Sequence, residues 1–444
     1  MGRAVRLLLL SLMVGVLGTS LATAQSDSSV NEPEAKATKT AKPTKTRTPT
    51  PTKTPKPTKT RTPTPTKTPK PTKTRTPTPT KTPKTKTPTP TRTATQTATR
   101  TATPTATATA ATGGLPVAAW VTDSSQRVLS FASGASGNAD PATIISGSNT
   151  GFETPDQLVL DSTGKIYVAN FVGAAAPGVI GDGSVTIYAA DSNGNMAPVA
   201  VIAGADTGLK NPSGVALDAS GNIYVANSGG GSTETGSVTV YPAGSNGDVS
   251  PSATIAGTIA DHDDGLAVPS AIAVGPDGKI YVANSDGGPS GVGSITVYAA
   301  GANGDVSPIA AITGDVLGDN NAGLSGPQSI AVDSSGTIYV ANESVIGGGT
   351  KGSVTIYPAG SNGNVTPSAT IAGDNTFVDI PSGVAVDAHG NIYVSNPEND
   401  LTDFPAGVIT VFAPGSNGNV APIATVGGDT SELNLPIGIA IKPQ

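Results

Sequence analysis

The residues best able to do chemistry are acidic side chains gathered in three irregular segments of the second half of the chain. The segments read ADHDDG, GDVLGDNN and PENDLTD, and their acids are Asp261, Asp263, Asp264, Asp315, Asp319, Glu398, Asp400 and Asp403. Clustered carboxylates are ligands that Ca²⁺ prefers. None of the segments has the D-x-D-x-D-G spacing of an EF-hand, so solvated loop acids are the alternative interpretation. We take Ca²⁺ as the candidate cofactor and Asp261, Asp263 and Asp264 as its candidate ligands.

Other catalytic chemistry has little support in the sequence. The chain has no Cys, which excludes disulfides, thiolate metal sites and cysteine nucleophiles. Its two His residues are His262, which stands alone, and His389, which lies in a repeated turn. No nucleophile–base pair and no phosphate-binding loop is recognisable. We therefore expect a protein that binds rather than catalyses.

Short β-strands in a fixed order surround these acids. Pattern A begins with Pro, at Pro155, Pro212, Pro269, Pro327, Pro381 and Pro436. Pattern B reads IYVAN or IYVSN and ends at Asn170, Asn227, Asn284, Asn342 and Asn396. Pattern C resembles GSVTIY, and pattern D resembles ATIAG. Each is a β-branched run bounded by Gly, Asn or Pro, which is typical of a strand.

The turns between these patterns join them into antiparallel units. D-x-x-G stands between A and B, and S-N-G-N or S-N-G-D stands between C and D. Asp can cap a tight turn, and Gly takes its positive φ. Units of four strands at a period of about 55 residues, without helices, predict an all-β fold, a β-propeller of four-stranded antiparallel blades.

The two ends of the repeat region predict how the ring closes. The first unit starts with a degenerate B at 119–123, and no A precedes it. The last A, at 436–441, has no B after it. The C-terminal strand therefore completes the first blade, which gives six blades and few exposed strand edges.

The phrases PSGVAVD-x-x-GNIYVAN and GSVTVY resemble NHL-repeat and YVTN-type β-propellers. The resemblance covers nearly all of 115–444 and implies that A–B and C–D hairpins share one face, while D–A and B–C loops share the other. The family is functionally diverse, so it implies a fold and a binding face rather than an activity. Asn replaces the Asp common at the end of strand B, and the Arg that often opens strand C is absent.

The D–A and B–C loops differ from blade to blade, so we expect the ligand to be read there. Most aromatic residues occupy repeated strand positions and are expected to be core. The position three residues before each strand-A Pro is also apolar, as in Phe152. The remaining aromatic and acidic candidates for the ligand face are Phe171, Phe377, Asp400, Asp403 and Phe404.

The first quarter of the chain is different in kind. Residues 1–24 carry two Arg, an apolar run and Ala22-Thr23-Ala24, which predicts a cleaved signal peptide and export. Residues 25–114 form a predicted disordered stalk, because 34 of the 75 residues from Thr38 to Thr112 are Thr and 15 are Pro. No later apolar run is long enough to cross a membrane.

Charge divides between stalk and propeller. Residues 25–112 hold 18 basic and three acidic residues, a net charge of +15, whereas 115–444 hold six basic and 29 acidic residues, a net charge of −23. The stalk is suited to an anionic cell-envelope polymer, with a passive spacer as the alternative. The acidic propeller does not suit nucleic acid.

Together these observations predict a bacterial exported surface protein, located extracellularly or in the cell envelope. We expect a monomeric, noncatalytic propeller at 115–444 that binds a protein or glycan. One alternative is a Ca²⁺-assisted enzyme similar to the propeller lactonases and lyases, and another is a purely structural envelope component.

The stalk should be thermally independent of the propeller. Limited proteolysis should remove residues 25–112, because a chain rich in Pro and like charges buries almost nothing. Calorimetry should give the same melting temperature for the chain from 25 and for the chain from 113. A drop of more than a few degrees without the stalk would contradict its independence.

Overall fold

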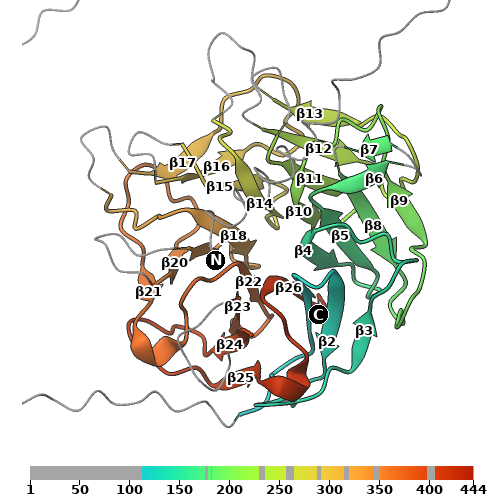
Figure 1. The fold of residues 1–444 in the computed structure, drawn as a ribbon. Helices are drawn as coiled ribbons and strands as arrows, with labels where there is room; N and C mark the ends of the chain where they lie inside the picture. The colour runs from blue at the N-terminus through green and yellow to red at the C-terminus, as the bar shows by residue number, and fades with distance from the viewer. Residues whose placement is uncertain are drawn as a thin grey trace, which may run out of the picture. The chain divides into compact units, whose positions relative to one another are not determined.

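Alternating β-branched runs separated by Gly turns form the strands, and the strands form six blades around a central axis (Figure 1). The computed structural model describes residues 113–175, 179–181, 183–229, 236–256, 265–287, 292–314, 320–343, 351–397 and 406–443. The predicted signal peptide and nearly all of the predicted stalk lie outside these residues. The all-β, six-bladed fold predicted from the repeats is confirmed.

Each blade is one four-stranded antiparallel sheet, in which strand A is innermost and strand D is outermost. Blade one is β26 (Pro436–Ile441), β1 (Ala119–Asp123), β2 (Arg127–Phe131) and β3 (Thr143–Ile145). Blade two is β4 (Pro155–Leu160), β5 (Ile166–Asn170), β8 (Ser184–Tyr188) and β9 (Ala200–Ile202). Blade three is β10 (Pro212–Leu217), β11 (Ile223–Asn227), β12 (Ser237–Tyr241) and β13 (Ala253–Ile255).

The other three blades repeat this order. Blade four is β14 (Pro269–Val274), β15 (Ile280–Asn284), β16 (Ser294–Tyr298) and β17 (Ala310–Thr313). Blade five is β18 (Pro327–Val332), β19 (Ile338–Asn342), β20 (Ser353–Tyr357) and β21 (Ala369–Ile371). Blade six is β22 (Gly383–Val386), β23 (Ile392–Asn396), β24 (Val408–Phe412) and β25 (Ala424–Gly427).

The C-terminal strand closes the ring as predicted. β26 pairs antiparallel with β1, with Val121 opposite Ile439 and Trp120 opposite Ala440. Figure 1 shows red β26 beside the blue-green strands of blade one. No covalent turn joins β26 to β1, so hydrogen bonds and packing alone hold the two ends of the propeller together.

The hydrophobic core lies between blades rather than within them. Six clusters of buried side chains each draw on two neighbouring blades, and together they span all six junctions. The cluster between blades one and six, for example, joins Val121 and Leu129 to Tyr393 and Ile409. Since both faces of each sheet are covered, every residue of the IYVAN strands is buried. Phe152, predicted to be structural, is buried and its ring lies 5.0 Å from that of Tyr188.

Hydroxyl groups connect neighbouring inner strands around the axis. Ser213 Oγ donates to the carbonyl of Pro269 at 2.7 Å, and Ser270 Oγ donates to the carbonyl of Pro327 at 2.6 Å. The strands also approach closely, because a Cβ on Gly214 would lie 2.9 Å from the Cα of Ala271. A small residue is therefore needed where the inner strands converge.

The outer rim is closed by the C–D hairpins. The Asn of S-N-G accepts a hydrogen bond from a strand-D N–H of the preceding blade, as in Asn246 with Val201 and Asn417 with Thr370, both at 2.9 Å. The following Gly forms a parallel β-bridge to the same strand, as in Gly247 with Ile202. The motif predicted as a simple turn thus also latches each blade to its neighbour and covers the outer strand edge.

Three segments depart from the predicted regularity. The loop after β5 contains an additional hairpin, β6 (Gly173–Ala175) and β7 (Val179–Gly181). Single-turn 3₁₀ helices, η1 (Asp374–Thr376) and η2 (Asp429–Ser431), lie in two D–A loops. The strand predicted to begin at Pro381 instead begins at Gly383.

The late start of β22 has a local cause. In the other five blades the residue before the strand-A Pro has a φ between 51° and 57°, at Thr154, Asn211, Val268, Gly326 and Leu435. That turn lets the Pro pair with the last residue of strand B in blades two to five, as in Pro212 with Asn227. Blade six shares with every blade a positive φ four residues before the Pro, here at Phe377, but it lacks the turn at Ile380, and pairing starts at Gly383 with Ser395.

Removing residues 435–444 should abolish cooperative unfolding. The deletion takes away β26 and exposes the clusters that blade one shares with blades two and six, including Ile439 and Ala440. Circular dichroism melts would show the loss. Deleting only Pro443 and Gln444 leaves β26 intact and should keep the transition. A normal melt for the long deletion would contradict the six-blade closure.

Candidate functional site

The antiparallel order of the strands divides the propeller surface into two faces. A–B turns and C–D hairpins lie on one, which we call the hairpin face. D–A and B–C loops lie on the other, which we call the variable face. The described chain starts on the hairpin face, because Gly113 bridges to Ala424 at the start of β25.

The A–B turns are built around one aspartate. Asp218 Oδ1 accepts the N–H groups of Ser220 at 2.8 Å and Asn222 at 2.9 Å. Burial opposes the ionisation of Asp161, Asp218 and Asp333, yet hydrogen bonds from their own turns prevail and lower the pKa of each below 3.8. These carboxylates are therefore charged at neutral pH.

The Tyr of strand B reaches the same aspartate. Tyr224, Tyr339 and Tyr393 donate from their hydroxyls to Asp218, Asp333 and Asp387 at 3.3, 3.1 and 3.3 Å. Burial, and then the nearby Asp333 charge, raise the pKa of Tyr339 to about 12. The hydroxyl keeps its proton, so an aromatic donor facing a carboxylate is the regular feature of this face.

The Asn that ends strand B is a structural residue. Asn227 is fully buried, and its Nδ2 donates to Ser237 Oγ and Thr239 Oγ1 of strand C, both at 3.2 Å. Its Oδ1 accepts the N–H of Lys210 from the D–A loop at 3.1 Å. Among the described Asn residues that end a strand B, only Asn396 leaves its Oδ1 without a partner, because the displaced start of β22 does not supply that N–H. Such burial leaves these side chains no access to a ligand at the mouth of the central channel.

Blade one carries Asp123 at this position, and an ion pair replaces the amide network. Arg127 donates to Asp123 Oδ2 at 2.5 Å and lies 3.3 Å from Glu432 Oε2 of the last D–A loop. Burial raises the pKa of Asp123, while Arg127 acts in the opposite direction. These ion pairs connect β1, which carries Asp123, and β2, which begins at Arg127, to the segment that precedes β26.

The structure describes two of the predicted site residues. Phe171 is half-buried at the end of β5, where its N–H donates to Thr154 and its carbonyl accepts from Asn211 Nδ2. Phe377 is only 5% exposed, because it ends η1 with its ring turned into the molecule. Asp261, Asp263, Asp264, Asp400, Asp403 and Phe404 lie outside the described residues. Their roles remain predictions, and the structure does not show these residues together.

No cluster of three or more His, Asp or Glu that could hold a metal ion exists within the described part of the chain. The candidate Ca²⁺ ligands are not among those residues, so the geometry does not assess that site. The described residues also include no helix long and apolar enough to cross a bilayer.

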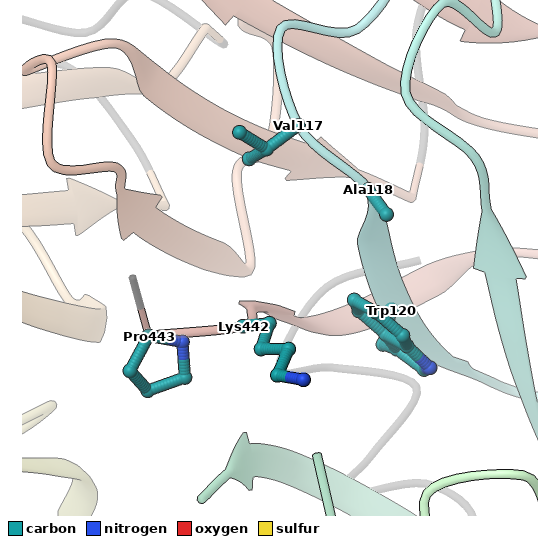
Figure 2. A pocket seen from close by; sticks show the side chains of 5 residues that line it. All are labelled: Val117, Ala118, Trp120, Lys442 and Pro443. Atoms are coloured by element: carbon teal, nitrogen blue, oxygen red, sulfur yellow. The ribbon is translucent and has the colours of Figure 1, made fainter. Parts of the chain in front are cut away.

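One hollow of about 370 Å³ lies at the seam of the ring, on the hairpin face. Val117, Ala118, Trp120, Lys442 and Pro443 line it (Figure 2). Trp120 is the single Trp of the chain and is half-buried, whereas Lys442 is exposed. None of these residues was predicted from the sequence as part of a site. Aligning the strand-A repeats would have singled out Lys442, which stands six residues after its Pro where Asp161, Asp218, Asp333 and Asp387 stand after theirs.

Comparison with known proteins gives only distant structural likeness. No family model and no curated protein matches the chain. A putative 6-phosphogluconolactonase from Bacteroides uniformis is 16% identical, with a TM-score of 0.43, and the match covers 70% of this chain and 82% of that one. The WD40 β-propeller domain of Doa1 is 10% identical with a TM-score of 0.39 and the same coverages. A chain of the mitotic checkpoint complex is 15% identical with a TM-score of 0.39, covering 65% and 69%.

Substituting Asp218 by Ala should destabilise the propeller by about 1 to 2 kcal/mol, because the carboxylate accepts four hydrogen bonds in its turn. The folded pKa is lowered from 3.8, so the stabilisation is complete above about pH 5 and is lost as the pH falls through the folded pKa. Urea unfolding of both proteins at pH 7 and at pH 3 should show the difference shrink.

Asp191→Ala is the control for that experiment, since Asp191 is an exposed acid in a C–D hairpin of the neighbouring blade. It should change stability by less than about 0.5 kcal/mol. An equal loss for both variants would assign the effect to net charge rather than to the turn.

Proposed function

We propose that this chain is an exported, noncatalytic binding protein. Its six-bladed propeller presents the variable face to a protein or glycan ligand, and its Thr/Pro-rich stalk connects it to the cell envelope. The resemblance of its repeats to NHL and YVTN-type propellers supports this assignment. So do the signal-like first 24 residues and the basic composition that follows.

The observation that carries the proposal is the separation of roles between the two faces. On the hairpin face the turn aspartates are bonded within their own turns, and the S-N-G hairpins are bonded to the next blade. The described chain begins on this face, where Gly113 bridges to Ala424 of blade six. Ligand recognition is thereby left to loops whose sequences differ between blades.

The inner framework supports such a role for the loops. Each long B–C loop starts beside a fully buried Asn, and in blades two to five the carbonyl before the strand-A Pro accepts the next N–H, as in Ser228 with Asn211 at 3.0 Å. Loop sequence can therefore vary while the loop ends stay fixed. This is the arrangement expected of a recognition surface on a rigid scaffold.

The test compares two sets of substitutions in the mature chain from residue 25. One set replaces Asp261, Asp263, Asp264, Asp400 and Asp403 by Asn on the variable face. The other replaces Lys165 and His389 by Ala on the hairpin face. Binding is measured on a glycan array and on envelope fractions of the source cell.

The variable-face set should weaken binding at least about tenfold, while the hairpin-face set should leave it within about twofold. Both should melt normally, because exposed loop charges usually change stability by under about 0.5 kcal/mol. Loss of binding only in the hairpin-face set would overturn the proposed binding face. If Ca²⁺ is the cofactor, adding it raises the melting temperature of the wild type and not of the acid variant.

A further inference from the structure

Blade one differs from the other five where strand A meets strand B. Elsewhere a covalent A–B turn covers the aromatic side chain of strand B. In blade one the chain enters at Val117 and leaves at Lys442 instead, so no turn is present. The strand register is nevertheless preserved, because Trp120 pairs with Ala440 as Tyr224 pairs with Ala216. Trp120 therefore occupies the position of the repeated Tyr.

The charge at this position is reversed. Lys442 stands at the repeat position of Asp218, Asp333 and Asp387, whose carboxylates receive the Tyr hydroxyls. Four blades have an Asp at this position and blade four has Gly275, whereas blade one has an ammonium group beside an aromatic ring (Figure 2). An anion at this position must therefore come from outside the repeat.

Lys442 also differs from three of the other basic side chains of the propeller. Within the described residues, Arg127, Lys279 and Lys351 form ion pairs with Asp123, Asp277 and Asp374. Lys442 makes no ion pair there, although the propeller carries 29 acids and only six bases. The nearest neighbouring turn approaches it through Gly164, whose added Cβ would lie 3.6 Å from Lys442 Nζ. Gly164 has the positive φ of the repeated D-x-x-G turn, and it places no side chain over the ammonium group.

We propose that the hollow at the seam binds a ligand that combines a six-membered ring with a carboxylate. The ring lies against Trp120, Val117 and Pro443, and the carboxylate accepts a charge-assisted hydrogen bond from Lys442. The volume, about 370 Å³, falls within the range of small-ligand sites. A uronic acid at the end of a glycan and an aromatic carboxylate share this chemistry.

The site is independent of the variable-face function proposed above, because it lies on the opposite face and uses none of the same residues. An aromatic ring offers its face to the apolar side of a sugar or to another ring. The ammonium group selects the acidic member of either class. A neutral analogue of the same shape should bind much less well.

The single Trp makes the experiment specific to the site, since any intrinsic Trp fluorescence comes from Trp120. The full chain is titrated with glucuronate and with benzoate, and in parallel with the neutral probes methyl glucoside and benzamide. Probe concentrations extend to about 10 mM, tenfold above the Kd of a weak 1 mM site. A saturable fluorescence change is expected with at least one carboxylate and should be at least about tenfold weaker with its neutral partner.

Substitutions then test whether carboxylate binding depends on direct contact with Lys442 or on positive surface charge in general. Lys442→Met should weaken carboxylate binding at least about tenfold and Lys442→Arg should largely restore it. Lys165→Met, which removes an exposed charge in the neighbouring turn, should leave binding within about twofold. Because the side chains of Lys442 and Lys165 are exposed, unchanged thermal melts are expected for all three variants.

The proposal is overturned if neither carboxylate gives a saturable change, if the neutral probes bind equally well, or if Lys165→Met has the effect of Lys442→Met. Binding of glucuronate alone assigns the site to acidic sugars. Binding of benzoate alone assigns it to aromatic acids. The variable-face experiment has a different readout, so either proposal can fail while the other stands.

Discussion

The burial of each blade between two neighbours is the interaction on which the rest of the structure depends. A four-stranded sheet of short strands has too little apolar surface to be stable alone. Here the second strand of blades two to six is buried along its whole length because a neighbouring blade covers each face. Every blade therefore needs a neighbour on each side, and all six have one only if the ring is closed. β26 closes it by replacing the missing strand A of blade one.

The same requirement explains why the two faces differ. Neighbouring blades are joined near the axis by Ser hydroxyls and at the rim by the Asn and Gly of the C–D hairpins. Because the rim contacts need an Asn and a Gly, the C–D hairpins of the hairpin face repeat nearly the same sequence. The variable face is held mainly at the ends of its loops, through the buried Asn of strand B and the carbonyl before the strand-A Pro. Between those anchors the sequence is free to diverge.

The sequence predicted the strands well because period-two alternation and Gly turns are local signals. Strands such as β5 and β11 begin and end where the IYVAN pattern does, and the unpaired first B predicted closure by β26. The shift of β22 was not predictable, since it depends on whether Ile380 takes a positive φ, and residues as different as Thr154, Val268 and Leu435 do so in other blades. The latch formed by S-N-G also has no local signature. Its partners lie about 45 to 50 residues away on another blade, as in Val201 with Asn246.

The candidate site was less predictable than the fold, and Phe377 shows why. Its place in a blade-specific loop indicated exposure, but η1 turns the chain so that the ring is 5% exposed. A loop sequence does not encode which of its side chains turns inward. The position of Lys442, in contrast, could have been read by comparing repeats. That comparison also needs the closure of blade one by β26, because β26 and β1 are not joined by an A–B turn.

Because a separate strand closes the ring, the seam between β26 and β1 has different contacts on the variable face and on the hairpin face. On the variable face, Arg127 bridges Asp123 and Glu432, and Ser124 donates to the carbonyl of Asn434, so ion pairs and a hydrogen bond connect the two sides of the seam. On the hairpin face no tight turn joins the segments at Val117 and Lys442, and a hollow lies between them beside Trp120. A residue at this point has no turn to stabilise, so Asp is not required and Lys442 is tolerated. The topology that closes the ring therefore also permits a basic residue where four other blades have the turn Asp.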